Sequence, residues 1–333
     1  MHIKSILLAA LIVFLANTGL NAGEKLQVFV SVIPQKYFVE RIAGELAEVN
    51  VLVTPGKSPA TYSPTPAQIK TLAGADLYFR IGVPFENGFM HKIASIAPDI
   101  RVVDTRKGIM LREMEDHIHE DDLHGGHSHD HSKTHDDHKA DDGQKDHGHA
   151  HDGNADDPHQ GGDDDHADLG AGKDPHIWMS PLRVKQQAAT MTEALIELAP
   201  AHAARFQENY DAFARELDRL HEKLKNTLAP LAGQNFFVFH PAFGYLADDY
   251  GLVQIPVETM GRAPKGKELS AIIKLAKEEK TRVIFVQPQF DQQAAGKIAE
   301  AIDGAVVSIN PLAPDYLDNM VRMADTIATA LAH

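Results

Sequence analysis

Short apolar runs alternate with amphipathic stretches along most of the chain, and this alternation constrains the fold more than any other feature of the sequence. The apolar runs are rich in β-branched residues and predict strands, whereas the stretches between them have helical spacing. The expected strands are 26–32, 48–53, 76–82, 100–105, 236–240, 253–257, 282–286 and 305–309, and the expected helices are 34–45, 64–75, 264–280, 291–303 and 314–332. Such an alternation predicts an α/β fold with mainly parallel sheets covered by helices.

One expected helix is longer than an ordinary α/β crossover. Residues 200–228 contain no proline or glycine after Pro200, and their apolar members recur at three- and four-residue steps. The pattern predicts a helix of about 29 residues, roughly 43 Å long. The strand–helix alternation stops before this helix and restarts after it. We therefore expect two lobes, each with a mainly parallel sheet, joined by one long helix, with a ligand in the cleft between them.

An acidic, histidine-rich insert interrupts the first lobe at residues 113–174. It holds 20 Asp and Glu against 4 Lys and Arg, so it carries all of the net charge of −15. The remainder is nearly neutral, which argues against nucleic acid as a partner. Low hydrophobicity and high charge predict a disordered insert. Its histidines are His117, His119, His124, His127, His129, His131, His135, His138, His147, His149, His151, His159 and His166.

The first 22 residues have the anatomy of a secretory signal peptide. Lys4 precedes an apolar run over residues 6–16, and small and polar residues lead to a cleavage site after Ala22. An uncleaved anchor is the alternative. The chain has no cysteine, so lipid attachment, thiol catalysis, disulfides and cysteine-based zinc sites are excluded. We expect a mature protein that is free in a bacterial periplasm.

The domain boundaries follow from these segments. We expect an N-terminal lobe over 23–112 that resumes over 175–199 after the insert, the long helix over 200–228, and a C-terminal lobe over 229–333.

Two histidines of the expected folded body lie at element boundaries. His176 stands just after Pro175 and just before the only tryptophan, and His240 directly follows an apolar strand and precedes a helix that is expected to start at Pro241. Ligands of α/β proteins gather at the carboxyl ends of strands. Position alone leaves two interpretations open, since each imidazole could bind a ligand or could cap a helix or satisfy a buried carbonyl. His91, His202, His221 and His333 lie on expected helix surfaces or at the terminus and are not predicted to be functional.

Four motifs resemble those of periplasmic zinc-binding proteins of ABC uptake systems, the ZnuA/TroA-like cluster. They are "PGKSPATYSPTPAQIKTLAGADLYFRIG", "DPHIWMSP", "FFVFHPAFGYLADDYGL" and "FVQPQFDQQAAGKIAEAIDGAVVSINPL". The resemblance implies a single metal between two α/β lobes joined by a rigid helix. His176 and His240 match its second and third ligand positions. Manganese-preferring relatives tend to have a carboxylate at the third position, so His240 favours zinc.

Two positions depart from the family pattern. Ala60 stands where a histidine is expected and cannot coordinate, and Asn310 replaces the usual aspartate with an uncharged, weak oxygen donor. The resemblance therefore implies that the folded body alone holds zinc poorly. Lys173, close to the end of the insert, is only three residues before His176, so the insert histidines could complete the cleft site as well as act as a zinc reservoir. A solvated spacer is the simpler interpretation of the insert.

The resemblance implies a high-affinity zinc-binding protein that is not an enzyme and that delivers Zn²⁺ to an inner-membrane ABC permease. We expect the protein to be a monomer. A zinc-buffering protein or metallochaperone without a transport role is the alternative, because of Ala60 and Asn310. A metal-dependent hydrolase is a more distant one, since the sequence lacks the H-E-x-x-H, G-x-S-x-G and P-loop signatures.

Overall fold

A computed structural model describes residues 25–114, 172–258 and 262–332. The expected signal peptide and the thirteen insert histidines lie outside these described residues. Among the helices that are described, none is both long and apolar enough to cross a membrane.

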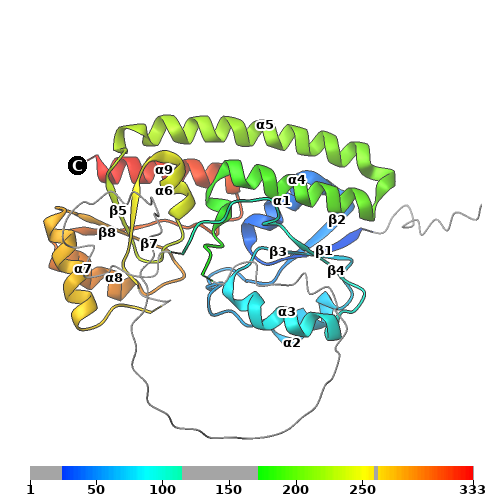
Figure 1. Ribbon diagram of the computed structural model, residues 1–333, viewed down its shortest axis with the longest axis horizontal. Helices are drawn as coiled ribbons and strands as arrows, with labels where there is room; N and C mark the ends of the chain where they lie inside the picture. Colours follow the sequence, from blue (N-terminus) through cyan, green and yellow to red (C-terminus); the bar gives the residue numbers. More distant parts are fainter. Residues whose placement is uncertain (1–24, 115–171, 259–261, 333) are drawn as a thin grey trace, which may run out of the picture.

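The first lobe is built on a four-stranded parallel sheet in the order β2-β1-β3-β4 (Figure 1). Its helices form the crossovers, as parallel pairing requires. The strands are β1 (Leu26–Val30), β2 (Ala47–Val51), β3 (Leu77–Arg80) and β4 (Arg101–Asp104), and the helices are α1 (Ile33–Ala43), α2 (Pro66–Leu72) and α3 (Pro84–Ile96).

The second lobe repeats this arrangement with the strand order β6-β5-β7-β8, again all parallel. Its strands are β5 (Asn235–Val238), β6 (Val253–Pro256), β7 (Val283–Val286) and β8 (Ala305–Ser308), and its helices are α6 (Gly244–Tyr250), α7 (Lys267–Glu278) and α8 (Gln292–Ala301). Each predicted strand is therefore present. The expectation of two parallel α/β lobes is confirmed.

Three long helices back the two lobes: α4 (Pro181–Leu198), α5 (Ala203–Leu228) and α9 (Tyr316–Leu331). In Figure 1, α5 extends over both lobes. Its 26 residues correspond to about 39 Å. The helix is three residues shorter than predicted, because Pro200–His202 form a separate 3₁₀ turn. Pro200 disfavours helical backbone at the residue before it, and Ala199 is accordingly non-helical.

The apolar core continues from one lobe to the other behind the cleft. Tyr316, at the start of α9, packs edge-on against Phe38 of α1 with ring centroids 4.9 Å apart. Its hydroxyl donates to the carbonyl of Trp178 (2.8 Å), and the Trp178 indole donates to the carbonyl of Pro311 (3.0 Å). The lobes are thus joined by packed side chains as well as by α5.

The segment after β5 differs from the sequence expectation. A helix starting at Pro241 was expected, but α6 begins at Gly244. The Ala242 N–H donates to the carbonyl of His240 (2.7 Å), which closes a tight turn ahead of the helix. This turn presents the His240 side chain at the carboxyl end of β5.

Candidate metal centre

His176 and His240 approach each other from opposite lobes. His240 follows β5, and His176 immediately precedes the 3₁₀ turn Ile177–Met179 that leads into α4. Their Nε2 atoms are 3.3 Å apart, and the two rings are nearly perpendicular. Two nitrogen ligands on a tetrahedral zinc with bonds of 2.0–2.1 Å would be about 3.3–3.4 Å apart. The spacing therefore matches one edge of a tetrahedral zinc site.

Asp174 orients His176 by contacting its Nδ1, the ring nitrogen on the side away from His240. One oxygen of this buried carboxylate lies 2.7 Å from His176 Nδ1 and also accepts the His176 backbone N–H at 2.9 Å. Burial alone would raise the pKa of Asp174, but the charge and hydrogen bonds of His176, together with Arg112, lower it below the usual value. The aspartate therefore stays ionised and holds the proton on Nδ1, which leaves Nε2 free to bind a metal.

Glu258 has the same relation to His240. It follows β6, the neighbour of β5, and its Oε1 contacts His240 Nδ1 at hydrogen-bonding distance. Burial lowers the pKa of His240 below the usual 6.5, and the Glu258 hydrogen bond offsets part of this effect. The lowered pKa favours the neutral imidazole that a metal requires. Oε2 of Glu258 is buried and has no hydrogen-bond partner among the described residues.

Residues after β7 fix His240 further. The amide of buried Gln287 accepts the His240 N–H at 3.2 Å and donates to the His240 carbonyl at 2.7 Å. The ring of Phe290 stacks on the imidazole with centroids 4.5 Å apart. His240 therefore has its backbone, its ring face and its Nδ1 all held, and only its Nε2 edge faces the cleft.

The two imidazoles line a cavity of about 240 Å³ whose opposite wall belongs to the first lobe. Ala60 lies in this wall and contributes only a methyl group. The lining residues are Pro59, Ala60, Gly82, Val83, Pro84, Asn87, Met114, Gly172, Lys173, Pro175, His176 and His240. Within the described part of the chain, no group of three or more His, Cys, Asp or Glu side chains could hold a metal. Among the described residues that line the cavity, only the two histidines are His, Cys, Asp or Glu.

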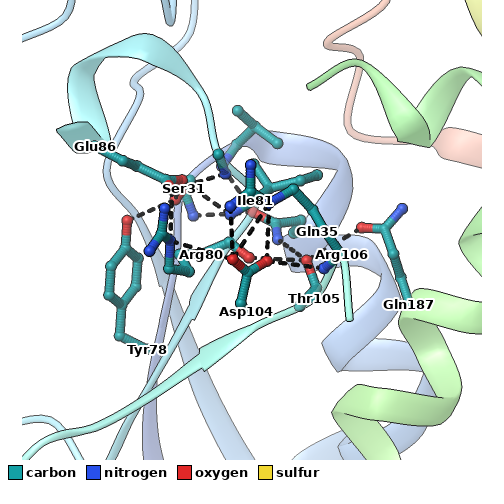
Figure 2. Close-up of polar contacts among 12 residues, drawn as sticks. Ser31, Gln35, Tyr78, Arg80, Ile81, Glu86, Asp104, Thr105, Arg106 and Gln187 are labelled. Carbon is teal, nitrogen blue, oxygen red and sulfur yellow. Dashed lines mark hydrogen bonds and ion pairs between the residues drawn. The ribbon is translucent and has the colours of Figure 1, made fainter. Parts of the chain in front are cut away.

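A buried polar network supports the first-lobe wall (Figure 2). Glu86, in the first turn of α3, accepts hydrogen bonds from the Ser31 hydroxyl (2.5 Å) and from the backbone N–H groups of Ile81 (3.0 Å) and Gly82 (2.7 Å). Burial raises the pKa of Glu86 despite these bonds. Gly82 has a φ of 85°, and a Cβ there would lie 2.0 Å from the Arg106 guanidinium. Buried hydrogen bonds and close packing therefore hold this wall, but the network offers the cavity no ligand.

Asn310 lies at the same edge of the second sheet but is not among the cavity-lining residues. Its side-chain oxygen accepts hydrogen bonds from Gln289 Nε2 (3.0 Å) and from the Leu312 N–H (3.1 Å). His91 and His202 are exposed, and His221 Nδ1 lies 3.2 Å from the Tyr250 hydroxyl, away from the pair. The structure brings together His176 and His240 and keeps these other residues apart from them.

Comparison with known proteins identifies the family. Residues 28–330 match the model described as "ZnuA: Zinc-uptake complex component A periplasmic". The chain belongs to this family. Members of the ZnuA family are zinc-binding solute-binding proteins and not enzymes, so the expected resemblance is confirmed.

Curated relatives and solved structures agree with the ZnuA assignment. The chain is 24% identical to the "High-affinity zinc uptake system protein ZnuA" of Yersinia pestis, covering 86% of this chain and 82% of that protein. It is also 24% identical to a "Putative metal-binding protein" of Chlamydia muridarum, covering 91% and 90%. A solved structure, "Crystal structure of ZnuA", is 32% identical with a TM-score of 0.73 and covers 92% of this chain and 99% of that one.

Sequence reasoning missed the groups that orient the two ligands. Asp174 is part of the "DPH" motif and could have been predicted from its proximity to His176. Glu258 and Gln287 are distant in sequence from His240, and only the β6-β5-β7 strand order brings them to it. The signal for both was available in principle, because each follows a strand that neighbours β5.

Proposed function

We propose that this ZnuA-family protein is a zinc receptor that binds Zn²⁺ between its lobes through His176 and His240 and delivers it to an inner-membrane ABC permease. The observation that carries the proposal is the 3.3 Å separation of the two Nε2 atoms, each on a ring whose Nδ1 is held by a buried carboxylate. A carboxylate on the second nitrogen fixes the tautomer and strengthens imidazole as a zinc ligand. Imidazole suits zinc, whereas manganese prefers oxygen ligands.

The route to the periplasm is part of the proposal. The first 22 residues would be removed as a signal peptide, and the mature chain would be a free monomer without a lipid anchor, since it has no cysteine.

The remaining zinc ligands are proposed to come from the insert. Zinc takes about four ligands, so two imidazoles leave two positions. The described residues near the two ends of the insert lie at the cavity: Met114 and Gly172 both line it, and the Met114 N–H donates to the Gly172 carbonyl at 2.8 Å. A histidine on a tether of tens of residues has an effective concentration on the order of millimolar at its attachment point. Asn310 would contribute only weakly, after giving up its present hydrogen bonds.

Zinc titration of three variants tests this assignment of ligands. We expect that deleting residues 116–168 weakens the tightest zinc site, and that adding Ala60→His to the deletion restores much of the loss. The matched control keeps the full length of the insert but carries asparagine at its thirteen histidines, and it should behave like the deletion. An unchanged tightest site in the deletion variant would show that the insert is only a reservoir or a spacer.

Two further measurements test cargo and delivery. Competition between Zn²⁺ and Mn²⁺ should favour zinc, and a preference for manganese would contradict the proposal. Zinc-limited cells that express the protein with its permease should grow better than cells with the permease alone. Tight zinc binding without any growth benefit would instead support the zinc-buffering or metallochaperone alternative.

A further inference from the structure

Arg112 lies between the carboxylate partner of His176 and the opposite lobe. Its Nη1 is 3.4 Å from Oδ2 of Asp174, the oxygen that His176 does not use. Its Nε donates to Asp248 of α6 at 3.0 Å. One guanidinium therefore contacts a first-lobe carboxylate behind a candidate zinc ligand and a carboxylate on a second-lobe helix.

The backbone around Arg112 makes the same connection. The Asp174 N–H donates to the Arg112 carbonyl at 3.0 Å, so the two segments that flank the insert are paired at this point. The hydroxyl of Tyr245, on α6, accepts the Arg112 N–H at 3.2 Å and donates to the Asp174 carbonyl at 2.8 Å. Both segments are thus held to α6.

The absence of a side chain at Gly244 makes room for the Arg112 guanidinium. A Cβ at this first residue of α6 would lie 1.6 Å from Arg112 Nη1 and 2.9 Å from Asp174 Oδ2. The guanidinium and the carboxylate therefore occupy the space that any larger residue at position 244 would need.

We propose that Arg112 is a positioning residue for zinc binding: it ties Asp174 to Asp248 and so holds His176 at the separation from His240 that zinc requires. The inference rests on the proposed function of the two histidines. Both oxygens of Asp174 are needed for this role, one to orient His176 and the other to fix the carboxylate against the second lobe. Partners behind a metal ligand commonly change metal affinity by about 10–100-fold.

The sign of the effect separates positioning from simple electrostatics. Removing a positive charge close to the site would, by charge alone, tighten the binding of a divalent cation. A weaker zinc complex after loss of Arg112 is therefore the result that positioning predicts and that charge does not.

The test measures the dissociation constant of the tightest zinc site in the full chain by chelator competition at substoichiometric zinc. We expect Arg112→Gln to raise this constant about tenfold. Arg41→Gln is the matched control, because Arg41 joins α1 to α5 through Glu216 (2.6 Å), is likewise partly buried, and contacts neither Asp174 nor Tyr245. The control should change zinc binding less than about twofold, within the small effect of a partly exposed ion pair.

Two more variants keep the proposal falsifiable if Arg112→Gln folds poorly. Gly244→Ala, which displaces the guanidinium and crowds Oδ2 of Asp174, should weaken zinc binding. Arg112→Lys should recover part of the affinity. The absorption spectrum of bound Co²⁺ should change in Arg112→Gln and Gly244→Ala but not in the Arg41→Gln control, which a role in folding alone would not produce.

The possible failures are distinguishable. If the unaltered protein binds no zinc, the proposed function fails. If it binds zinc and Arg112→Gln leaves the affinity unchanged or tighter, the positioning role is wrong while the zinc site stands.

Discussion

On each side of the cleft, a buried carboxylate contacts Nδ1 of the histidine. The negative charge of the two carboxylates is balanced in different ways. On the first-lobe side, Asp174 contacts His176 with one oxygen and Arg112 with the other. On the second-lobe side, Glu258 contacts His240 with one oxygen, and the other is buried without a partner among the described residues. The first carboxylate has a cation of its own, whereas the second is left to balance the charge of an incoming metal. Glu258 should therefore contribute more to zinc affinity than Asp174.

The largest expected effect is the loss of either imidazole. His176→Ala or His240→Ala should weaken the tightest zinc site by more than about 100-fold, beyond the usual effect of a ligand's partner. The fold should persist, because the two lobes share a core behind the cleft. Calorimetric zinc titration measures the loss, with His91→Ala as the exposed control. Unfolding of both metal-free variants while the parent stays folded would mean that the two histidines are structural.

The comparison of carboxylates predicts the next effect. Glu258→Gln should weaken zinc binding by about 100-fold and Asp174→Asn by about tenfold, the two ends of the usual range for such partners. Both substitutions preserve shape and remove one negative charge. Chelator competition on the two variants compares them directly. Equal losses would show that the unpartnered oxygen of Glu258 has no special role in charge balance.

The first-lobe wall should matter for stability and little for zinc. In Glu86→Gln an amide NH₂ must face one of the donors that now contact the carboxylate, and a buried donor left unsatisfied costs about 1–3 kcal/mol. Urea denaturation should show this loss. Zinc affinity should change less than about twofold, because the wall offers no ligand and the Glu86 hydrogen bonds involve neither histidine. A large loss of affinity would mean that the wall does contribute to the metal site.

The smallest effect concerns pH. His240 has a pKa below 6.5 in the folded protein, so the unfolded chain takes up its proton first as the pH falls. The contribution of His240 to the free energy of unfolding is therefore present above about pH 6.5 and is lost as the pH falls below it. The loss is about 1.4 kcal/mol for each tenfold difference in proton affinity between the unfolded and the folded chain. Urea denaturation of metal-free protein between pH 5 and about 7.5 should show this slope. His240→Asn should flatten it, and an unchanged slope would assign the effect to another group.

The strands were predictable because their signal is local. Runs such as "FFVFH" and "RVIFV" combine apolar and β-branched residues, and β5 overlaps the first run while β7 lies within the second. The seven-residue helix α6 was harder to place, because Pro241 resembles a helix start while hydrogen bonds from Gln287 and Ala242 hold His240 in a turn. Tertiary contacts decide that boundary, and local sequence does not contain them.

In the candidate site, too, some features follow from local sequence and others only from tertiary contacts. His176 and His240 were predictable from their positions at element boundaries and from the family motifs. Their separation, the Glu258 partner and the guanidinium of Arg112 depend on how the lobes pack, which no single segment encodes. Ala60, which cannot coordinate, lines the cavity together with the two histidines.

The only tryptophan of the chain is buried beside the candidate site, with its ring 5.1 Å from that of His176. Its indole also donates to the carbonyl of Pro311 in the other lobe. Indole emission responds to the charge of a neighbouring group and to a change in its own hydrogen bond. The molecule therefore carries an intrinsic optical reporter at one position, sensitive both to the state of a zinc ligand and to the contact between the lobes, with no second tryptophan to obscure it.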